Sequence, residues 1–168
     1  VVIDVLNLDP SFEHHWSAYG FWAPAIQDYV DMEIMDWWGT KEMESLFELV
    51  DPFNVKERFE MPKLLVNAAG DQFFIPTSSQ FYFDELPGEK YLRYVPNADH
   101  NVSDGTDALE TILAFYASIL NKVPRPEFSW KLSEDGSIEV LSENQVKEVM
   151  MWSATNKKDR DFRKDTIG

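Results

Sequence analysis

The sequence contains no cysteine, which excludes disulfide bonds, thiolate catalysis and metal sites built on cysteine. Basic residues are scarce, because 15 Lys and Arg stand against 30 Asp and Glu, for a net charge of −15. Nucleic acids and anionic lipid surfaces are bound through basic clusters, so we expect neither as a partner. No apolar run approaches the roughly 20 residues that span a bilayer, so we expect no transmembrane segment.

The chain does contain enough apolar material for a core. Of its 168 residues, 44% are hydrophobic and 14% are aromatic, a composition that excludes wholesale disorder. Its length is that of one domain, at roughly 150 residues per domain. The first residues, Val1-Val2-Ile3, are β-branched and apolar and follow no methionine. We therefore expect the chain to be part of a larger protein, beginning within a strand.

Apolar runs and helix signals alternate along the first two thirds of the chain. We predict strands over residues 1–8, 63–69 and 90–95, each ended by turn-forming residues. We predict helices over residues 24–32, 41–50, 76–86 and 109–120. Thr40 would cap the second of these helices, and Ser103 or Asp104 the last. This order predicts an α/β fold with a parallel sheet and right-handed helical connections.

After Asn121 the pattern changes. Pro124-Arg125-Pro126 indicates a linker, and short alternating strands are predicted over residues 128–132, 137–141 and 146–152, with a hairpin turn at 134–136. We therefore expect two domains. Residues 1–123 would be the C-terminal part of an α/β domain, with an aromatic-rich helical insert over about residues 11–60, and residues 124–168 the start of a small antiparallel β domain.

Two residues with catalytic chemistry follow the predicted strands. Ligands of open α/β sheets bind beyond the carboxyl ends of the strands, where Asp71 follows the second strand and His100 the third. Adjacent parallel strands would bring the two together, and a carboxylate that orients an imidazole is the acid–base half of a serine triad. Asp99 is a second carboxylate that could partner His100. Alternatively, Asp71 only forms a turn or caps a helix, and His100 is a polar surface group.

No serine fits the nucleophile of such a triad. Gly-x-Ser-x-Gly does not occur in the chain, and no serine follows a strand into a helix, as a nucleophile elbow requires. Ser78 and Ser79 stand at the start of a predicted helix, which we expect them to cap. Any nucleophile is therefore expected to precede Val1, and this chain by itself is expected to be inactive.

Several segments resemble the PhoPQ-activated pathogenicity-related proteins, in order along nearly the whole chain. They are residues 19–22 (YGFW), 51–53 (DPF), 62–76 (PKLLVNAAGDQFFIP), 81–101 (FYFDELPGEKYLRYVPNADHN), 152–156 (WSATN) and 160–163 (RDFR). The resemblance implies an α/β-hydrolase-type domain followed by a β-rich domain, with Asp71 as the triad acid and His100 as the base. It also implies a serine upstream of Val1 and an exported protein. The predicted acid–histidine pair itself suggests small-molecule esters or peptides as substrates, and we expect no cofactor.

The pair His14-His15 allows a functional and a structural interpretation. With Asp9 and Glu13 it offers oxygen and nitrogen ligands for a metal ion. However, adjacent histidines point in different directions on most backbones, and no H-x-x-x-H or HExxH spacing occurs. Packing or surface exposure is therefore the favoured interpretation, and we expect no metal site.

Three tryptophans of the aromatic-rich stretch also allow two interpretations. Trp22, Trp37 and Trp38 could line an apolar substrate pocket above the catalytic edge of the sheet. Large apolar side chains are mostly buried, however, so packing between the insert and the sheet is the favoured interpretation.

The acidic residues are concentrated in the first part of the chain. Residues 1–60 carry 13 acidic and 3 basic side chains, which either attract cationic substrates or keep a solvated helix surface soluble; the second interpretation is favoured. The aromatic density and the β tail also allow a different function, that of a non-catalytic secreted or surface module that binds a protein or peptide. A fold by itself does not separate this function from hydrolysis.

Overall fold

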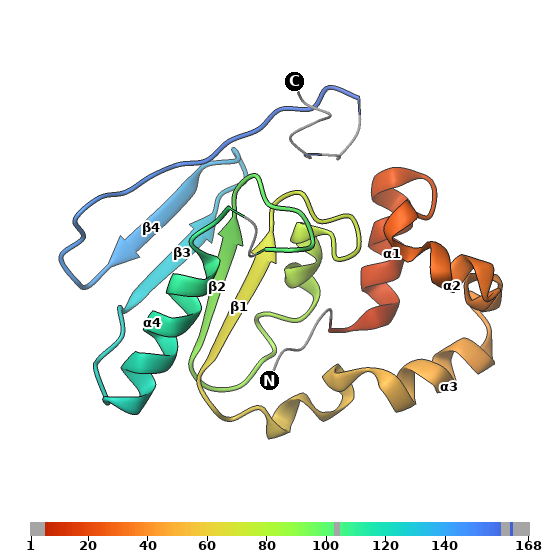
Figure 1. Ribbon diagram of the computed structural model, residues 1–168, viewed down its shortest axis with the longest axis horizontal. Coiled ribbons are helices and arrows are strands. Elements are labelled where there is room, and N and C mark those ends of the chain that lie inside the picture. The colour runs from red at the N-terminus through yellow and green to blue at the C-terminus, as the bar shows by residue number, and fades with distance from the viewer. Residues whose placement is uncertain (1–5, 103–104, 159–161, 163–168) are drawn as a thin grey trace. The chain divides into compact units, whose positions relative to one another are not determined.

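The computed structural model describes residues 6–102, 105–158 and 162. These residues form two compact units. The first comprises the described residues up to Leu109 and a segment that begins at Ala154, and the second runs from Glu110 to Ser153. Helices and a parallel strand pair make up the first unit, so the α/β class is confirmed (Figure 1). The predicted domain boundary near residue 124 stays a prediction.

Short helices make up the first part of the first unit (Figure 1). They are α1 (Leu8–Tyr19), the 3₁₀ helix η1 (Pro24–Ile26), α2 (Gln27–Asp31), η2 (Ile34–Trp37), α3 (Lys41–Val50) and η3 (Pro52–Arg58). The helix predicted over residues 24–32 therefore forms as η1 followed by α2. Among the described residues, no helix has both the length and the apolar character needed to cross a membrane.

Helix α1 replaces the end of the strand predicted over residues 1–8. Residues 1–5 lie outside the described residues, Leu6 and Asn7 form no strand, and Leu8 already begins the helix. The sequence prediction took Asp9-Pro10 as a turn. Pro10 is instead the third residue of α1, a position where the missing N–H costs nothing, because the first four N–H groups of a helix have no intrahelical partner.

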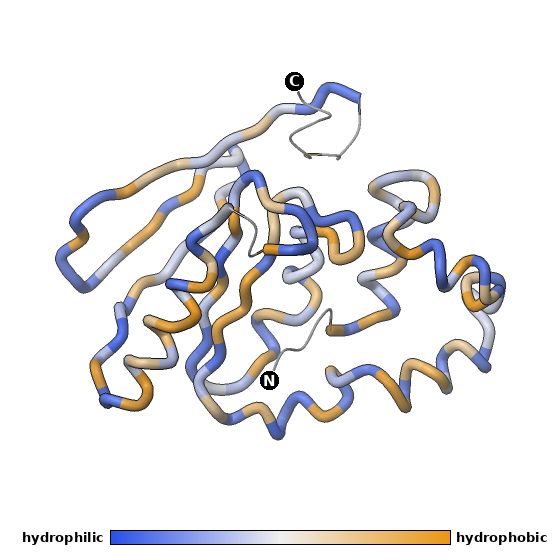
Figure 2. The backbone as a smooth tube through the Cα atoms, viewed as in Figure 1, coloured by the Kyte–Doolittle hydropathy of each residue, from blue (hydrophilic) through white to orange (hydrophobic). Residues whose placement is uncertain are grey.

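Helix α3 forms as its sequence predicts. The Oγ1 atom of Thr40 accepts the Met43 N–H at 3.3 Å, which is the hydrogen bond of an N-cap. Apolar residues recur at helical spacing, and Figure 2 shows hydrophilic and hydrophobic residues alternating along the helix. The helix ends before Asp51-Pro52, because the residue before a proline avoids the helical region.

Strands β1 (Lys63–Ala68) and β2 (Lys90–Val95) pair in parallel, as predicted. Lys63 lies opposite Lys90 and Ala68 opposite Val95, so both strands end at the same edge. At this edge, the last residues of the two strands, Ala68 and Val95, pack with Ala98 and Ala108 in a buried apolar cluster.

The connection between the two strands differs from its prediction. In place of a helix over residues 76–86, the structure has a 3₁₀ helix, η4 (Pro76–Phe81), followed by turns. Its N-cap, Ile75, makes no side-chain cap bond. Beyond η4, a second apolar cluster joins Leu6 to Tyr82, Phe83 and Leu86. The connection thus packs against Leu6, which lies just before α1.

Helix α4 (Ala108–Leu120) begins in the first unit and continues into the second. Its predicted caps, Ser103 and Asp104, lie outside the described residues. The second unit also contains β3 (Phe128–Leu132) and β4 (Ile138–Ser142), which pair antiparallel. The strand predicted over residues 146–152 was wrong: among the described residues, that segment pairs with no strand and stays irregular.

Candidate active site

The loops after β1 and β2 are joined by backbone hydrogen bonds beyond the last strand pair. The Ala69 N–H donates to the Val95 carbonyl at 3.0 Å, and the Gly70 N–H donates to the Ala98 carbonyl at 2.9 Å. The chain after β1 is therefore held against the chain after β2 as far as Gly70. The next residue after Gly70 is Asp71, and His100 comes two residues after Ala98.

The carboxylate of Asp71 is held by its own loop. Its Oδ1 atom accepts the Phe73 N–H at 2.7 Å and the Phe74 N–H at 3.1 Å. Only 6% of the residue is exposed. Because two backbone donors fix one carboxylate oxygen, the direction of the other oxygen is fixed as well.

That other oxygen meets the imidazole of His100. The His100 Nδ1 atom lies 3.0 Å from Asp71 Oδ2. Since a carboxylate oxygen only accepts, Nδ1 carries the hydrogen and the neutral ring presents Nε2 as its acceptor. The carboxylate is buried, whereas 57% of the His100 side chain is exposed. The partner of His100 is therefore Asp71, while Asp99 is exposed.

Two phenylalanines complete the surroundings of the imidazole. The ring centroids of Phe73 and Phe74 each lie 5.3 Å from that of His100. The same two residues supply the N–H groups that hold Asp71, so one short segment orients both members of the pair. The sequence analysis did not single them out, although their position directly after Asp71 is the signal that could have found them.

The serines near this pair have structural contacts that differ from those predicted. Ser79 donates to the Tyr94 hydroxyl at 2.6 Å, since Tyr94 itself donates to the Pro76 carbonyl. Ser78 lines a cavity between α1 and η4. The prediction that Ser78 and Ser79 cap a helix was therefore wrong, because η4 has no side-chain cap.

The three tryptophans proposed for a pocket lie in different surroundings. Trp22 and Trp38 belong to a cluster of aromatic rings. Their ring centroids are 5.9 Å apart, and each lies within 6.3 Å of the ring centroid of Phe12. Trp37 is 53% exposed. The contacts of Trp22 and Trp38 fit the packing interpretation, and neither they nor Trp37 is among the residues that line the cavity described above.

The two adjacent histidines have separate partners. His14 Nε2 shares a hydrogen bond of 2.6 Å with Thr77 Oγ1. His15 is buried, and its Nε2 accepts the Ala23 N–H at 3.0 Å. Across the described residues, no group of three or more carboxylate or imidazole side chains is arranged to hold a metal ion.

Comparison with known proteins places these residues in a family. The family model of the PhoPQ-activated pathogenicity-related proteins matches residues 1–163. Autocrine proliferation repressor protein A of Dictyostelium discoideum is 35% identical over 176 aligned positions, which cover 97% of this chain and 36% of that protein. The chain thus spans about a third of the length of this relative, and no solved structure matches it. The chain belongs to the family of PhoPQ-activated pathogenicity-related proteins.

Proposed function

We propose that this chain supplies the acid and the base of a serine hydrolase that acts on ester or amide bonds. Asp71 would be the acid and His100 the base, and the nucleophilic serine would lie in a segment that precedes Val1 in a longer protein. The observation that carries the proposal is the 3.0 Å contact between Asp71 Oδ2 and His100 Nδ1 at the ends of adjacent parallel strands. The order of acid before histidine is also that of α/β-hydrolases.

Each half of the pair has the surroundings that its role needs. The base must reach a substrate and a nucleophile, and the exposed ring of His100 presents Nε2 for this purpose. The acid must hold the tautomer and stabilise the imidazolium. Asp71 can do so because it is buried and fixed by the N–H groups of Phe73 and Phe74. In the reaction, His100 would take the serine proton and later protonate the leaving group.

Labelling with a fluorophosphonate tests this function, because the probe reacts with activated serines. The full-length protein should be labelled, and His100→Ala should abolish the labelling. Asp71→Asn should slow it by on the order of 10⁴-fold, as when a triad loses the carboxylate that fixes its histidine. Asp99→Asn is the matched control: its exposed carboxylate is not the partner of His100, so labelling should keep its wild-type rate.

A second function, binding by the aromatic insert without catalysis, is favoured by one observation. Trp16, Phe21 and Trp37 are 49%, 54% and 53% exposed, although aromatic side chains of this size are usually buried. The relative in Dictyostelium carries the name of a proliferation repressor rather than that of an enzyme. A folded full-length protein that the fluorophosphonate does not label would overturn the hydrolase proposal and favour this one.

A further inference from the structure

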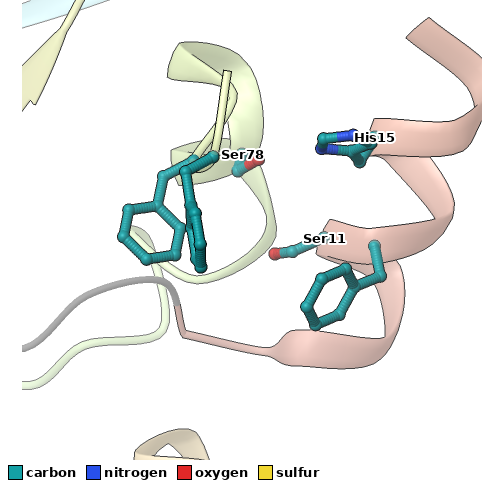
Figure 3. A pocket seen from close by; sticks show the side chains of 6 residues that line it. Ser11, His15 and Ser78 are labelled. Carbon is teal, nitrogen blue, oxygen red and sulfur yellow. The ribbon is translucent and has the colours of Figure 1, made fainter. Parts of the chain in front are cut away.

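A small cavity lies between α1 and η4. Figure 3 shows the side chains of Ser11, His15 and Ser78 around the space between the two helices. The cavity measures about 10 Å³ and is lined by Ser11, Phe12, His15, Phe73, Phe74 and Ser78. A cavity of about this size holds one water molecule or one atom of similar size.

One of the residues that line the cavity, His15, has a buried polar atom without a hydrogen-bond partner. His15 is only 2% exposed, and its Nε2 accepts the Ala23 N–H, so the ring hydrogen must sit on Nδ1. No hydrogen-bond partner reaches Nδ1 from the described residues. Leaving a buried donor unpaired costs about 1–3 kcal/mol, so an acceptor at this point would stabilise the structure.

The ring of His15 is neutral near pH 7. Burial, and to a lesser extent the charge of the neighbouring His14, lowers its pKa from 6.5 to about 4. Nδ1–H is therefore a neutral donor, and no cationic side chain lines the cavity. An anion such as a carboxylate would lose its hydration there without gaining a counter-charge.

We propose that this cavity is a binding site for one neutral acceptor oxygen, which takes its main hydrogen bond from Nδ1–H of His15. Ser11 and Ser78 complete the site. The Ser11 hydroxyl donates to the Leu6 carbonyl at 3.1 Å, which leaves its oxygen as an acceptor. Ser78, at 3% exposure, offers a hydroxyl that can donate or accept. The phenylalanines add apolar surface to the lining.

Two sources can supply such an oxygen, a resident water molecule or the carbonyl of an ester or amide. The carbonyl is suggested by Phe73 and Phe74, which line the cavity and also pack against the ring of His100. A substrate bound beside His100 would therefore share these walls. The carbonyl source rests on the proposed function, whereas the water source does not.

Nuclear magnetic resonance of the full-length protein, labelled with ¹⁵N at histidine, tests the site without any catalytic readout. We expect a protected Nδ1–H signal from His15, with a dipolar cross-peak to water. N-methylacetamide is the probe for a neutral carbonyl, and sodium acetate is the matched anion. Loss of the water cross-peak with N-methylacetamide, but not with acetate, would assign the site to a carbonyl. A water cross-peak that neither compound removes would assign it to resident water.

Two variants separate the site from the fold. His15→Gln keeps an acceptor for the Ala23 N–H but removes the Nδ1 donor, and it should abolish the Nδ1–H signal together with its cross-peak to water. Ser78→Ala leaves the His15–Ala23 hydrogen bond intact and should weaken probe binding about fivefold, the value of one neutral hydrogen bond. A folded protein in which Nδ1 carries no hydrogen, or in which Nδ1–H contacts neither water nor probe, would overturn the proposal. Serine labelling reports on the proposed function separately.

Discussion

The burial of His15 makes the stability of the protein sensitive to acid. Its pKa is lowered from 6.5 to about 4, so as the pH falls through this window the unfolded chain takes up a proton before the folded one does. The contribution of neutral His15 to the free energy of unfolding is therefore complete above pH 6.5 and is lost as the pH falls toward 4. At 1.36 kcal/mol per pKa unit, the loss between pH 7 and pH 4.5 is about 2 kcal/mol.

Urea unfolding at the two pH values measures this loss. His15→Gln should reduce the difference between pH 7 and pH 4.5 by about 2 kcal/mol, because glutamine does not titrate and can still accept the Ala23 N–H. Carboxylates titrate equally in both proteins, so they cancel in the comparison. An equal acid loss in the variant would contradict the assignment to His15.

At the scale of elements, Asp51 joins two helices through one carboxylate. Its Oδ1 accepts the Phe53 N–H at 2.9 Å, at the start of η3, and the Asn7 N–H at 3.2 Å; its Oδ2 accepts the Leu8 N–H at 2.6 Å, at the start of α1. Asp51 thus satisfies N–H groups at the start of α1 from 43 and 44 positions away in the sequence.

We predict that Asp51→Asn destabilises the protein by about 1–2 kcal/mol, because an amide replaces the charged acceptor of three N–H groups. Chemical denaturation measures the change in the free energy of unfolding. Asp99→Asn, which removes the same charge at an exposed position, should stay within about 0.5 kcal/mol of wild type. Equal losses in the two variants would attribute the effect to net charge and contradict the capping role.

The elements that could be predicted from the sequence are those whose signals lie within the element itself. Strands β1 and β2, and the cap Thr40 of α3, are local signals: short apolar runs bounded by glycine or proline, and a threonine before a periodic helix. The meeting of Asp71 and His100 also follows from local signals, since each comes within five residues of the end of a parallel strand. Helix α1 could not be predicted in this way, because the side-chain acceptor for the N–H groups at its start is contributed by Asp51 from a distant part of the chain.

Tertiary packing explains the remaining differences at this scale. Residues 146–152 contain enough apolar residues for a strand, but a strand needs a partner, and none pairs with it among the described residues. The burial of His15 had no sequence signal, because its partner is the backbone N–H of Ala23. On α4, apolar residues recur at helical spacing, yet they are 42–64% exposed; they are Leu109, Ile112, Leu113, Tyr116 and Leu120.

At the scale of the whole molecule, the net charge of −15 is spread unevenly. The first 60 residues hold 13 of the 30 acidic side chains and only 3 of the 15 basic ones. Like charges at this density repel one another in the folded state, and salt screens exposed charges beyond a Debye length of about 10 Å at 0.1 M. The folded chain should therefore gain stability from added salt.

A substitution of Glu48 tests this repulsion directly. It is exposed in the last turn of α3, where residues 47–50 contain no basic side chain and the helix dipole disfavours a negative charge. Glu48→Gln should raise the free energy of unfolding by about 0.3–1 kcal/mol at low salt, and the gain should shrink as NaCl is added. Glu139→Gln, at an exposed position of β4 outside the acidic segment, should give no gain, because Glu139 lies opposite Lys131 and the change removes an opposite-charge cross-strand pair. Thermal unfolding of the three proteins at 10 mM and 0.5 M NaCl distinguishes local repulsion from the general effect of salt on burial, which is the same in all three. A gain in Glu48→Gln that does not depend on salt would show that lost charge repulsion is not its cause.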